Sequence, residues 1–108
     1  NLISPEALVQ TLKAMGKVPQ ANIFRASLPV AGISGTLRNR FKNTPAQGIV
    51  QAKTGTMSGV TALSGYVDAP NYQTVVFSII VNQSDQAAAP LRQAVDEMVV
   101  LLTRLKRC

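Results

Sequence analysis

The 108-residue sequence contains no histidine and only one cysteine, Cys108. Without histidine, the chain lacks the usual general base of Ser-His-Asp and Cys-His enzymes and the commonest zinc ligand. A single cysteine can form neither an internal disulfide nor a cysteine-rich metal site. Any catalysis by these residues must therefore use lysine, carboxylate or tyrosine side chains for proton transfer.

Long apolar runs are also missing. No stretch of about 18 apolar residues is present, and the first residues do not pair a charged region with an apolar one, so neither a membrane span nor a signal peptide is visible. The sequence begins with Asn1 instead of methionine and reaches a helix signal almost at once. We therefore expect residues 1–108 to be an excerpt, an incomplete part of one domain.

Acidic residues are few. The sequence contains five Asp and Glu and eleven Lys and Arg, which gives a net charge of +6. Such a charge suits an anionic partner. The basic residues are scattered, however, and they lack the interleaved aromatic residues of a strand-binding platform. A nucleic-acid partner is therefore not expected.

The first third of the chain has helical signals followed by a loop. Ser4 is a suitable N-cap and Pro5 fits the first helical position, which predicts a helix over residues 4–15. A second short helix is predicted over residues 20–27. Residues 28–35 are too rich in glycine and proline for regular structure, and residues 36–41 are predicted to form a helical turn.

The remainder predicts an antiparallel sheet and a terminal helix. Residues 49–54, 60–67 and 74–81 have strand composition, and residues 69–72 predict a tight hairpin between the last two strands. Gly65 indicates a bulge or a close backbone approach. A helix from about residue 86 should pack on the sheet through one face, comprising Leu91, Val95, Met98, Leu102 and Leu105. These elements predict an α+β fold.

The segment Lys53-Thr54-Gly55-Thr56 carries the chemistry, and we place it where the first strand gives way to a turn containing Gly59. A strand-borne lysine offers a fixed cation for a substrate carboxylate, and the next hydroxyl offers a second donor. The glycine allows close approach of substrate to the backbone. Taken alone, the tripeptide also fits a solvated lysine near a turn.

Two longer segments carry a family resemblance. They are KTGTMSGVTALSGYV at residues 53–67 and, upstream, SLPVAGISGTLRNRF at residues 27–41. In this order they resemble the D-alanyl-D-alanine carboxypeptidase/endopeptidase family of low-molecular-mass penicillin-binding proteins. The resemblance covers essentially the whole chain. It implies the C-terminal part of a serine β-lactamase/transpeptidase-like fold, in which the terminal helix packs beside an N-terminal helix on the sheet.

The resemblance also implies residue roles. Lys53 would neutralise the terminal carboxylate of a peptidoglycan stem peptide or β-lactam, Thr54 would donate a hydrogen bond to it, and Gly55 would keep the strand edge open. The backbone N–H of Thr56 would be one of two oxyanion donors, and Met57 would line the pocket for the stem side chain, although it could equally be a core residue. The family usually has an acidic residue where this chain has Ser34, whose hydroxyl would then have to brace the loop.

The family's nucleophile is not in these residues. A Ser-x-x-Lys motif supplies the serine and its base, and a Ser-x-Asn motif assists proton transfer, but no serine here is followed three residues later by lysine. The missing N-terminal part of the same polypeptide would supply both motifs, and Ser27, Ser58, Ser64 and Ser78 are not expected to act as nucleophiles. The expected reaction is serine acyl transfer on D-Ala-D-Ala, which requires no metal or organic cofactor.

Two other functions stay open at this point. A serine β-lactamase or esterase could share the same Lys-Thr-Gly wall, and the upstream region would decide between them. A non-catalytic basic module could bind peptidoglycan or another anionic polymer, which a retained Ser-x-x-Lys motif would exclude. The resemblance implies that the complete protein acts in the periplasm or the extracytoplasmic envelope of a bacterium.

Overall fold

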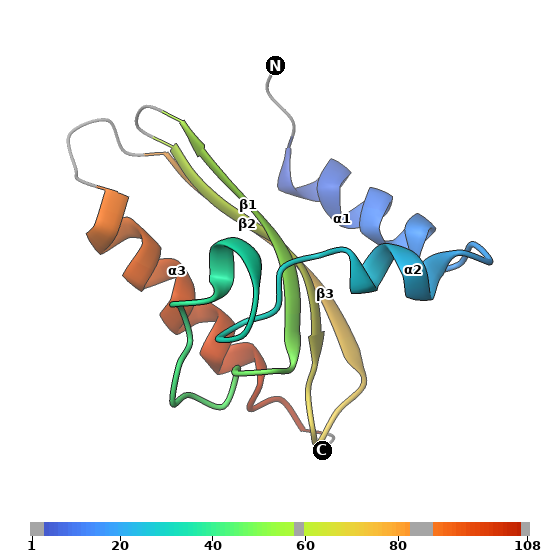
Figure 1. Cartoon of the computed structure of the whole chain (residues 1–108). Coiled ribbons are helices and arrows are strands. Elements are labelled where there is room, and N and C mark those ends of the chain that lie inside the picture. The colour runs from blue at the N-terminus through green and yellow to red at the C-terminus, as the bar shows by residue number, and fades with distance from the viewer. Residues whose placement is uncertain (1–3, 58–59, 83–87, 107–108) are drawn as a thin grey trace.

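The computed structural model describes residues 4–57, 60–82 and 88–106. Its helices are α1 (Pro5–Met15), α2 (Ala21–Ala26) and α3 (Ala88–Leu102), with a 3-10 turn, η1, at Gly35–Leu37. Its strands are β1 (Val50–Met57), β2 (Val60–Asp68) and β3 (Thr74–Asn82). Figure 1 shows the sheet between α1 and α2 on one side and α3 on the other. The predicted α+β class is confirmed.

Helix α1 begins as the sequence predicts. The side chain of Ser4 accepts a hydrogen bond from the backbone N–H of Ala7 at 3.1 Å, and Pro5 occupies the first helical position. The predicted second helix is confirmed as α2. The helical turn predicted over residues 36–41 is shorter and begins one residue earlier, because only η1 at Gly35–Leu37 has helical hydrogen bonding.

The sheet is antiparallel with strand order β1-β2-β3, as predicted. Strand β1 differs from the prediction because it continues to Met57 and does not end at Thr54. Gly55 pairs with Ala62 and Thr56 with Thr61, so the ladder with β2 holds the segment extended. The Lys-Thr-Gly motif therefore lies inside a strand, and Ser58 and Gly59 of the expected turn lie outside the described residues.

Gly65 marks a close backbone approach and not a bulge. The register between β1 and β2 runs without interruption, and Gly65 lies opposite Ala52. A Cβ atom at Gly65 would overlap the backbone of Gln51 and lie 2.5 Å from the Cα atom of Ala52. Glycine is therefore required here by packing inside the sheet.

One face of the sheet carries the main core. Val50, Ala52 and Leu63 of this face are fully buried, together with Val95 and Val99 of α3. The predicted set of five α3 residues is partly wrong. Leu91 and Val95 are buried and Leu102 is half-buried, but Met98 is 45% exposed and Leu105 is 39% exposed.

The reason for this difference is the phase of helix α3. The buried stripe follows four-residue steps through Leu91, Val95 and Val99, which turns Met98 away from the sheet. The helix also ends at Leu102, before Leu105, and Gln86, where we predicted it to begin, lies outside the described residues. No helix among the described residues is long and apolar enough to cross a bilayer.

The opposite face of the sheet packs against α1. Leu12 of α1, Leu28 and Tyr66 form a second buried cluster there. The hydroxyl of Tyr66 donates to the backbone carbonyl of Leu12 at 2.5 Å, and burial raises the pKa of Tyr66 while nearby Arg25 opposes the shift. Because α1 and α3 lie on opposite faces (Figure 1), the expected packing of the terminal helix beside an N-terminal helix is not made by α1.

Candidate functional site

The edge of β1 away from β2 is covered along only half of its length. Ala31 N–H donates to the carbonyl of Val50 at 2.9 Å, and Ala52 N–H donates to the carbonyl of Pro29 at 3.0 Å. These bonds attach the α2–β1 loop, residues 27–49, to the start of the strand. Within the part of the chain that the structure describes, no segment pairs with this edge beyond Ala52.

The ladder determines which backbone groups face the uncovered edge. In an antiparallel strand, alternate residues direct their N–H and C=O groups to opposite edges. Val50 and Ala52 direct theirs to the α2–β1 loop, so Thr54 and Thr56, in the same alternation, direct theirs to the same side. The N–H of Thr56 thus lies on the edge that the predicted oxyanion role requires.

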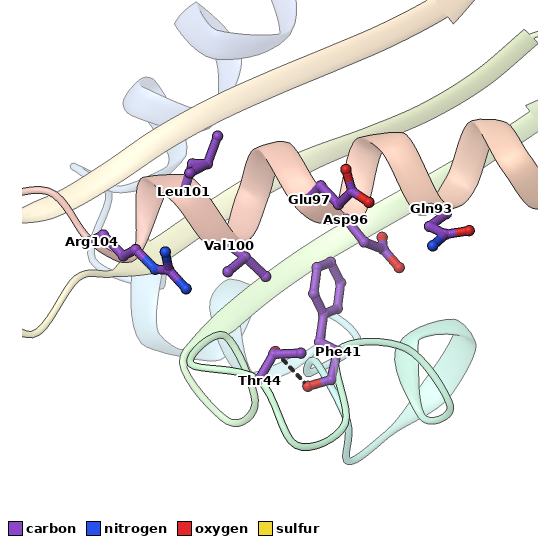
Figure 2. A pocket seen from close by; sticks show the side chains of 8 residues that line it. All are labelled: Phe41, Thr44, Gln93, Asp96, Glu97, Val100, Leu101 and Arg104. Carbon is purple, nitrogen blue, oxygen red and sulfur yellow. Dashed lines mark hydrogen bonds between the residues drawn. The ribbon is translucent and has the colours of Figure 1, made fainter.

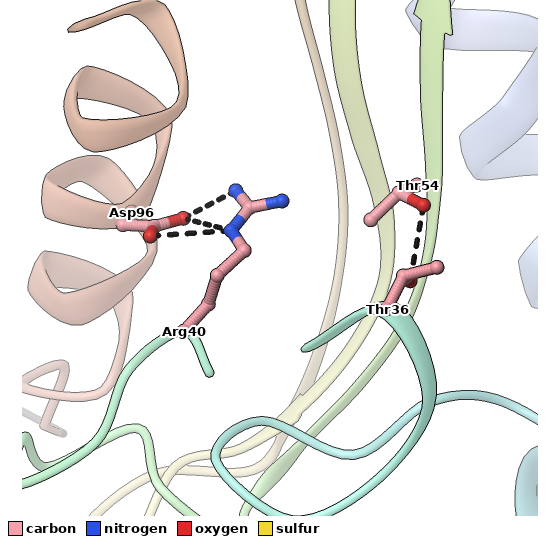
Figure 3. Close-up of polar contacts among 4 residues, drawn as sticks. All are labelled: Thr36, Arg40, Thr54 and Asp96. Carbon is pink, nitrogen blue, oxygen red and sulfur yellow. Dashed lines mark hydrogen bonds and ion pairs between the residues drawn. The ribbon is translucent and has the colours of Figure 1, made fainter. Parts of the chain in front are cut away.

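The side chains of Lys53 and Thr54 leave the strand on opposite faces. Lys53 is exposed on the α1 face, and its Nζ atom donates to the carbonyl of Thr54 at 3.0 Å. Thr54 is half-buried on the α3 face, and its hydroxyl donates to the hydroxyl of Thr36 at 3.1 Å (Figure 3). The edge between them is therefore bordered by a cation on one face and by two hydroxyl groups on the other.

Gly55 is exposed and has no internal packing reason to be glycine. A Cβ atom built there would meet only the Cβ of Ala62, at an ordinary contact distance of 3.7 Å. Gly65 differs, because a Cβ atom there would overlap the backbone of β1. The predicted role of the Met57 side chain lies outside what the structure describes, as does Ser58.

The α2–β1 loop holds Thr36 in position through an ion pair that the sequence did not predict. Arg40 donates from its Nη2 atom to Oδ1 of Asp96, and from Nε to both carboxylate oxygens at 3.2 and 3.3 Å (Figure 3). The two residues are 56 positions apart. Their pairing fastens the loop to α3, which places Thr36 next to Thr54.

Ser34 braces the loop from within. Its Oγ atom accepts a hydrogen bond from the backbone N–H of Val30 at 3.0 Å. Val30 forms the bridge to Gln51 of β1. The hydroxyl thus supports the turn directly.

Two of the cavities formed by the described residues border α3. A cavity of about 500 Å³ contains Thr54 of the predicted site and is lined by Thr36, Asn39, Arg40, Thr54 and Arg92. The other, of about 490 Å³, lies between α3 and the turn at Phe41 and Thr44 (Figure 2), and none of the predicted site residues lines it. Sequence reasoning assigned none of the four residues beside Thr54 to the site.

The serines of the described segments have structural partners. The hydroxyl groups of Ser64 and Ser78 are 2.8 Å apart across β2 and β3, and Ser27 donates to the carbonyl of Phe24 at 2.6 Å. Ser64 lies opposite Lys53 in the ladder, but the Nζ atom of Lys53 is bonded to Thr54. Within the described residues, no lysine is hydrogen-bonded to a serine hydroxyl, so this geometry provides no activated nucleophile.

Comparison with known proteins identifies one matching family and relatives with names of the same kind. Residues 1–105 match the family described as the D-Ala-D-Ala carboxypeptidase 3 (S13) family. The chain is 49% identical over 96 residues to a D-alanyl-D-alanine carboxypeptidase of an Actinomadura species, covering 84% of this chain and 18% of that protein. It is 40% identical over 113 residues to penicillin-sensitive carboxypeptidase A of Dictyostelium discoideum, covering 96% of this chain and 21% of that protein.

A solved structure has the same arrangement. Penicillin binding protein 4 (dacB) from Haemophilus influenzae superposes with a TM-score of 0.85 at 25% identity, covering 97% of this chain and 25% of that one. The same protein has also been solved in complex with a β-lactam. The chain thus spans about a fifth of the length of the curated relatives named above.

Proposed function

The chain belongs to the D-Ala-D-Ala carboxypeptidase 3 (S13) family, and on this premise we propose that it forms one wall of the active site of a serine-type D-Ala-D-Ala carboxypeptidase or endopeptidase. The observation that carries the proposal is the uncovered half of β1, where Lys53, Thr54 and Thr56 border one strand edge. An extended peptide can lie along such an edge and use its free N–H and C=O groups.

The residues of this wall have distinct roles in the proposal. Lys53 supplies the positive charge for the terminal carboxylate of the stem peptide or β-lactam, and Thr54 supplies a hydroxyl on the other face. Gly55 leaves the edge open to the substrate backbone. The N–H of Thr56 stabilises the oxyanion of the tetrahedral intermediate, and Met57 lines the pocket for the stem side chain.

The nucleophile belongs to the remainder of a longer polypeptide in this proposal. An N-terminal part contributes the serine and lysine of a Ser-x-x-Lys motif, and residues 1–108 form the C-terminal portion of the penicillin-binding domain. Serine attack on the D-Ala-D-Ala amide releases the terminal D-Ala, and water then hydrolyses the acyl-enzyme. Because peptidoglycan lies in the cell envelope, we propose an extracytoplasmic, periplasmic-type location.

The family match and the name of the Actinomadura relative favour this function over a β-lactamase or esterase of the same fold. The non-catalytic peptidoglycan-binding module is the second candidate, favoured by the net charge of +6. The two differ in a single observable, which is covalent attachment of a β-lactam to a serine.

The test is to label two polypeptides with a fluorescent penicillin and to locate the adduct by mass spectrometry. One polypeptide is this chain alone, and the other extends it through its N-terminal part. We expect a stoichiometric adduct on the extended polypeptide, on a serine outside these residues, and none on the chain alone. An adduct on a serine of residues 1–108 would contradict the divided site, and an unlabelled extended polypeptide would favour the non-catalytic module.

A further inference from the structure

Each described residue that lines the cavity beside Thr54 has a side-chain hydrogen-bond donor. Thr36 and Thr54 contribute hydroxyl groups, Asn39 an amide, and Arg40 and Arg92 guanidinium groups. Among the described residues that line it, none is acidic. Because Thr54 also borders the uncovered edge of β1, the cavity continues the proposed site towards α3. Its composition suits an anionic group better than a neutral or cationic one.

Within the described residues, Arg92 is the cation of this cavity that forms no ion pair. Both carboxylate oxygens of Asp96 are engaged by Arg40, so these two charges offset one another. Arg92 is partly buried and lies one helical turn before Asp96. In the described ranges, the ion pairs are Arg25–Asp68 and Arg40–Asp96, and neither includes Arg92. A partly buried charge of this kind is screened less by solvent than a fully exposed one.

Thr36 has the hydroxyl proton that a ligand could use. A threonine hydroxyl has one proton to donate and two lone pairs that accept. The proton of Thr54 is directed to the oxygen of Thr36 at 3.1 Å. This bond leaves the proton of Thr36 available to a ligand.

We infer that this cavity is a carboxylate-recognition subsite, in which Arg92 supplies the charge and the pair Thr36–Thr54 supplies the hydrogen bonds. The inference rests on the proposed function. It places a second cation across the strand from Lys53, so that the carboxylate of a stem peptide or β-lactam is approached from both faces of β1. The Arg40–Asp96 pair positions Thr36 and does not itself bind the carboxylate.

The test compares benzylpenicillin, which carries a free carboxylate, with its neutral methyl ester on the complete polypeptide. We expect Arg92→Gln to slow acylation by the acid about tenfold and to leave acylation by the ester within about twofold, the acid's loss amounting to about 1.4 kcal/mol. The loss should appear in the apparent dissociation constant and not in the rate at saturation. Thr36→Val should reduce the ratio of the acylation rates of acid and ester by less than Arg92→Gln does. Arg92→Lys should retain most of the ratio of the unaltered polypeptide.

Arg38→Gln is the matched control. Arg38 is an exposed cation of the α2–β1 loop, and it does not line the cavity. Thermal unfolding of each variant checks that the fold is retained. Equal losses for acid and ester in Arg92→Gln, or an equal loss in Arg38→Gln, would overturn the subsite while leaving the proposed function in place. An unaltered polypeptide that forms no adduct with penicillin would refute the proposed function and the subsite together.

Discussion

The two halves of strand β1 differ in what covers them. From Val50 to Ala52 the strand is paired on both edges, by β2 and by the α2–β1 loop, and the side chains of Val50 and Ala52 are fully buried. From Lys53 onwards the ladder with β2 continues, but Lys53 and Gly55 are exposed. The first half thus anchors the strand, and the second half has the open edge at which we propose that a ligand binds.

The difference shows how one strand can be anchored at one end and open along one edge at the other. An unpaired strand edge tends to associate with other strands, and on β1, within the described residues, it is restricted to the residues that carry the proposed chemistry. The anchored half fixes the twist and register of the open half, so the Thr54 and Thr56 amides need no further support from the loop.

The largest effect that we expect concerns the cation of the open half. Lys53→Ala in the complete polypeptide should lower the rate of acylation by penicillin about 100-fold, because the ligand carboxylate would lose a cation with which it pairs once the bound ligand excludes water from the edge. Lys13→Ala is the control, since Lys13 is an exposed cation on α1. The measurement is the second-order acylation rate. Equal rates for the two variants would refute the role of Lys53.

A pair of glycine substitutions tests the two halves separately. Gly65→Ala should lower the free energy of unfolding by about 3 kcal/mol, because the added methyl group overlaps the backbone of Gln51 and Ala52. Gly55→Ala should leave stability within about 0.5 kcal/mol, since its Cβ finds only ordinary contact. It should nevertheless slow acylation.

Urea unfolding and penicillin acylation, measured on both variants of the complete polypeptide, separate the two effects. The comparison between the halves fails if Gly55→Ala unfolds at the lower urea concentration. It also fails if Gly55→Ala acylates at the unaltered rate.

The smallest effect concerns Tyr66, which lies opposite Gln51 in the anchored half. Tyr66→Phe should cost about 1 kcal/mol of stability, because the carbonyl of Leu12 loses one of its two donors and keeps the N–H of Gly16. Burial raises the pKa of Tyr66 in the folded state. The contribution of Tyr66 to the free energy of unfolding is therefore complete below the ordinary tyrosine pKa of about 10. It is lost as the pH rises through the raised pKa of the folded state.

Stability measured by urea unfolding between pH 8 and pH 11, an interval chosen around the ordinary tyrosine pKa of about 10, checks this prediction. The unaltered protein should lose more stability over the alkaline part of the range than Tyr66→Phe does. Parallel curves for the two proteins would show that Tyr66 does not titrate in a buried position.

Much of the fold followed from local patterns. The Ser4 cap with Pro5 predicted the start of α1, and runs of β-branched residues predicted the three strands. The phase of α3 was harder, because its sequence is apolar on more than one side. Met98 and Val99 both fit a four- and three-residue step, and contact with the sheet selects Val99 as the buried residue.

The amino-acid sequence by itself determined the element types, the family resemblance and the order of Lys53, Thr54 and Gly55, because these depend on neighbouring residues along the chain. Only the tertiary structure decided which half of β1 is covered and which face each helix occupies (Figure 1). It also decided that Arg40 pairs with Asp96 and lines, together with Arg92, the cavity beside Thr54. Contacts between residues so far apart have no local period. They form because the α2–β1 loop must bury Ala31, Leu37 and Phe41 against the sheet and α3, and that burial brings the polar groups around them together.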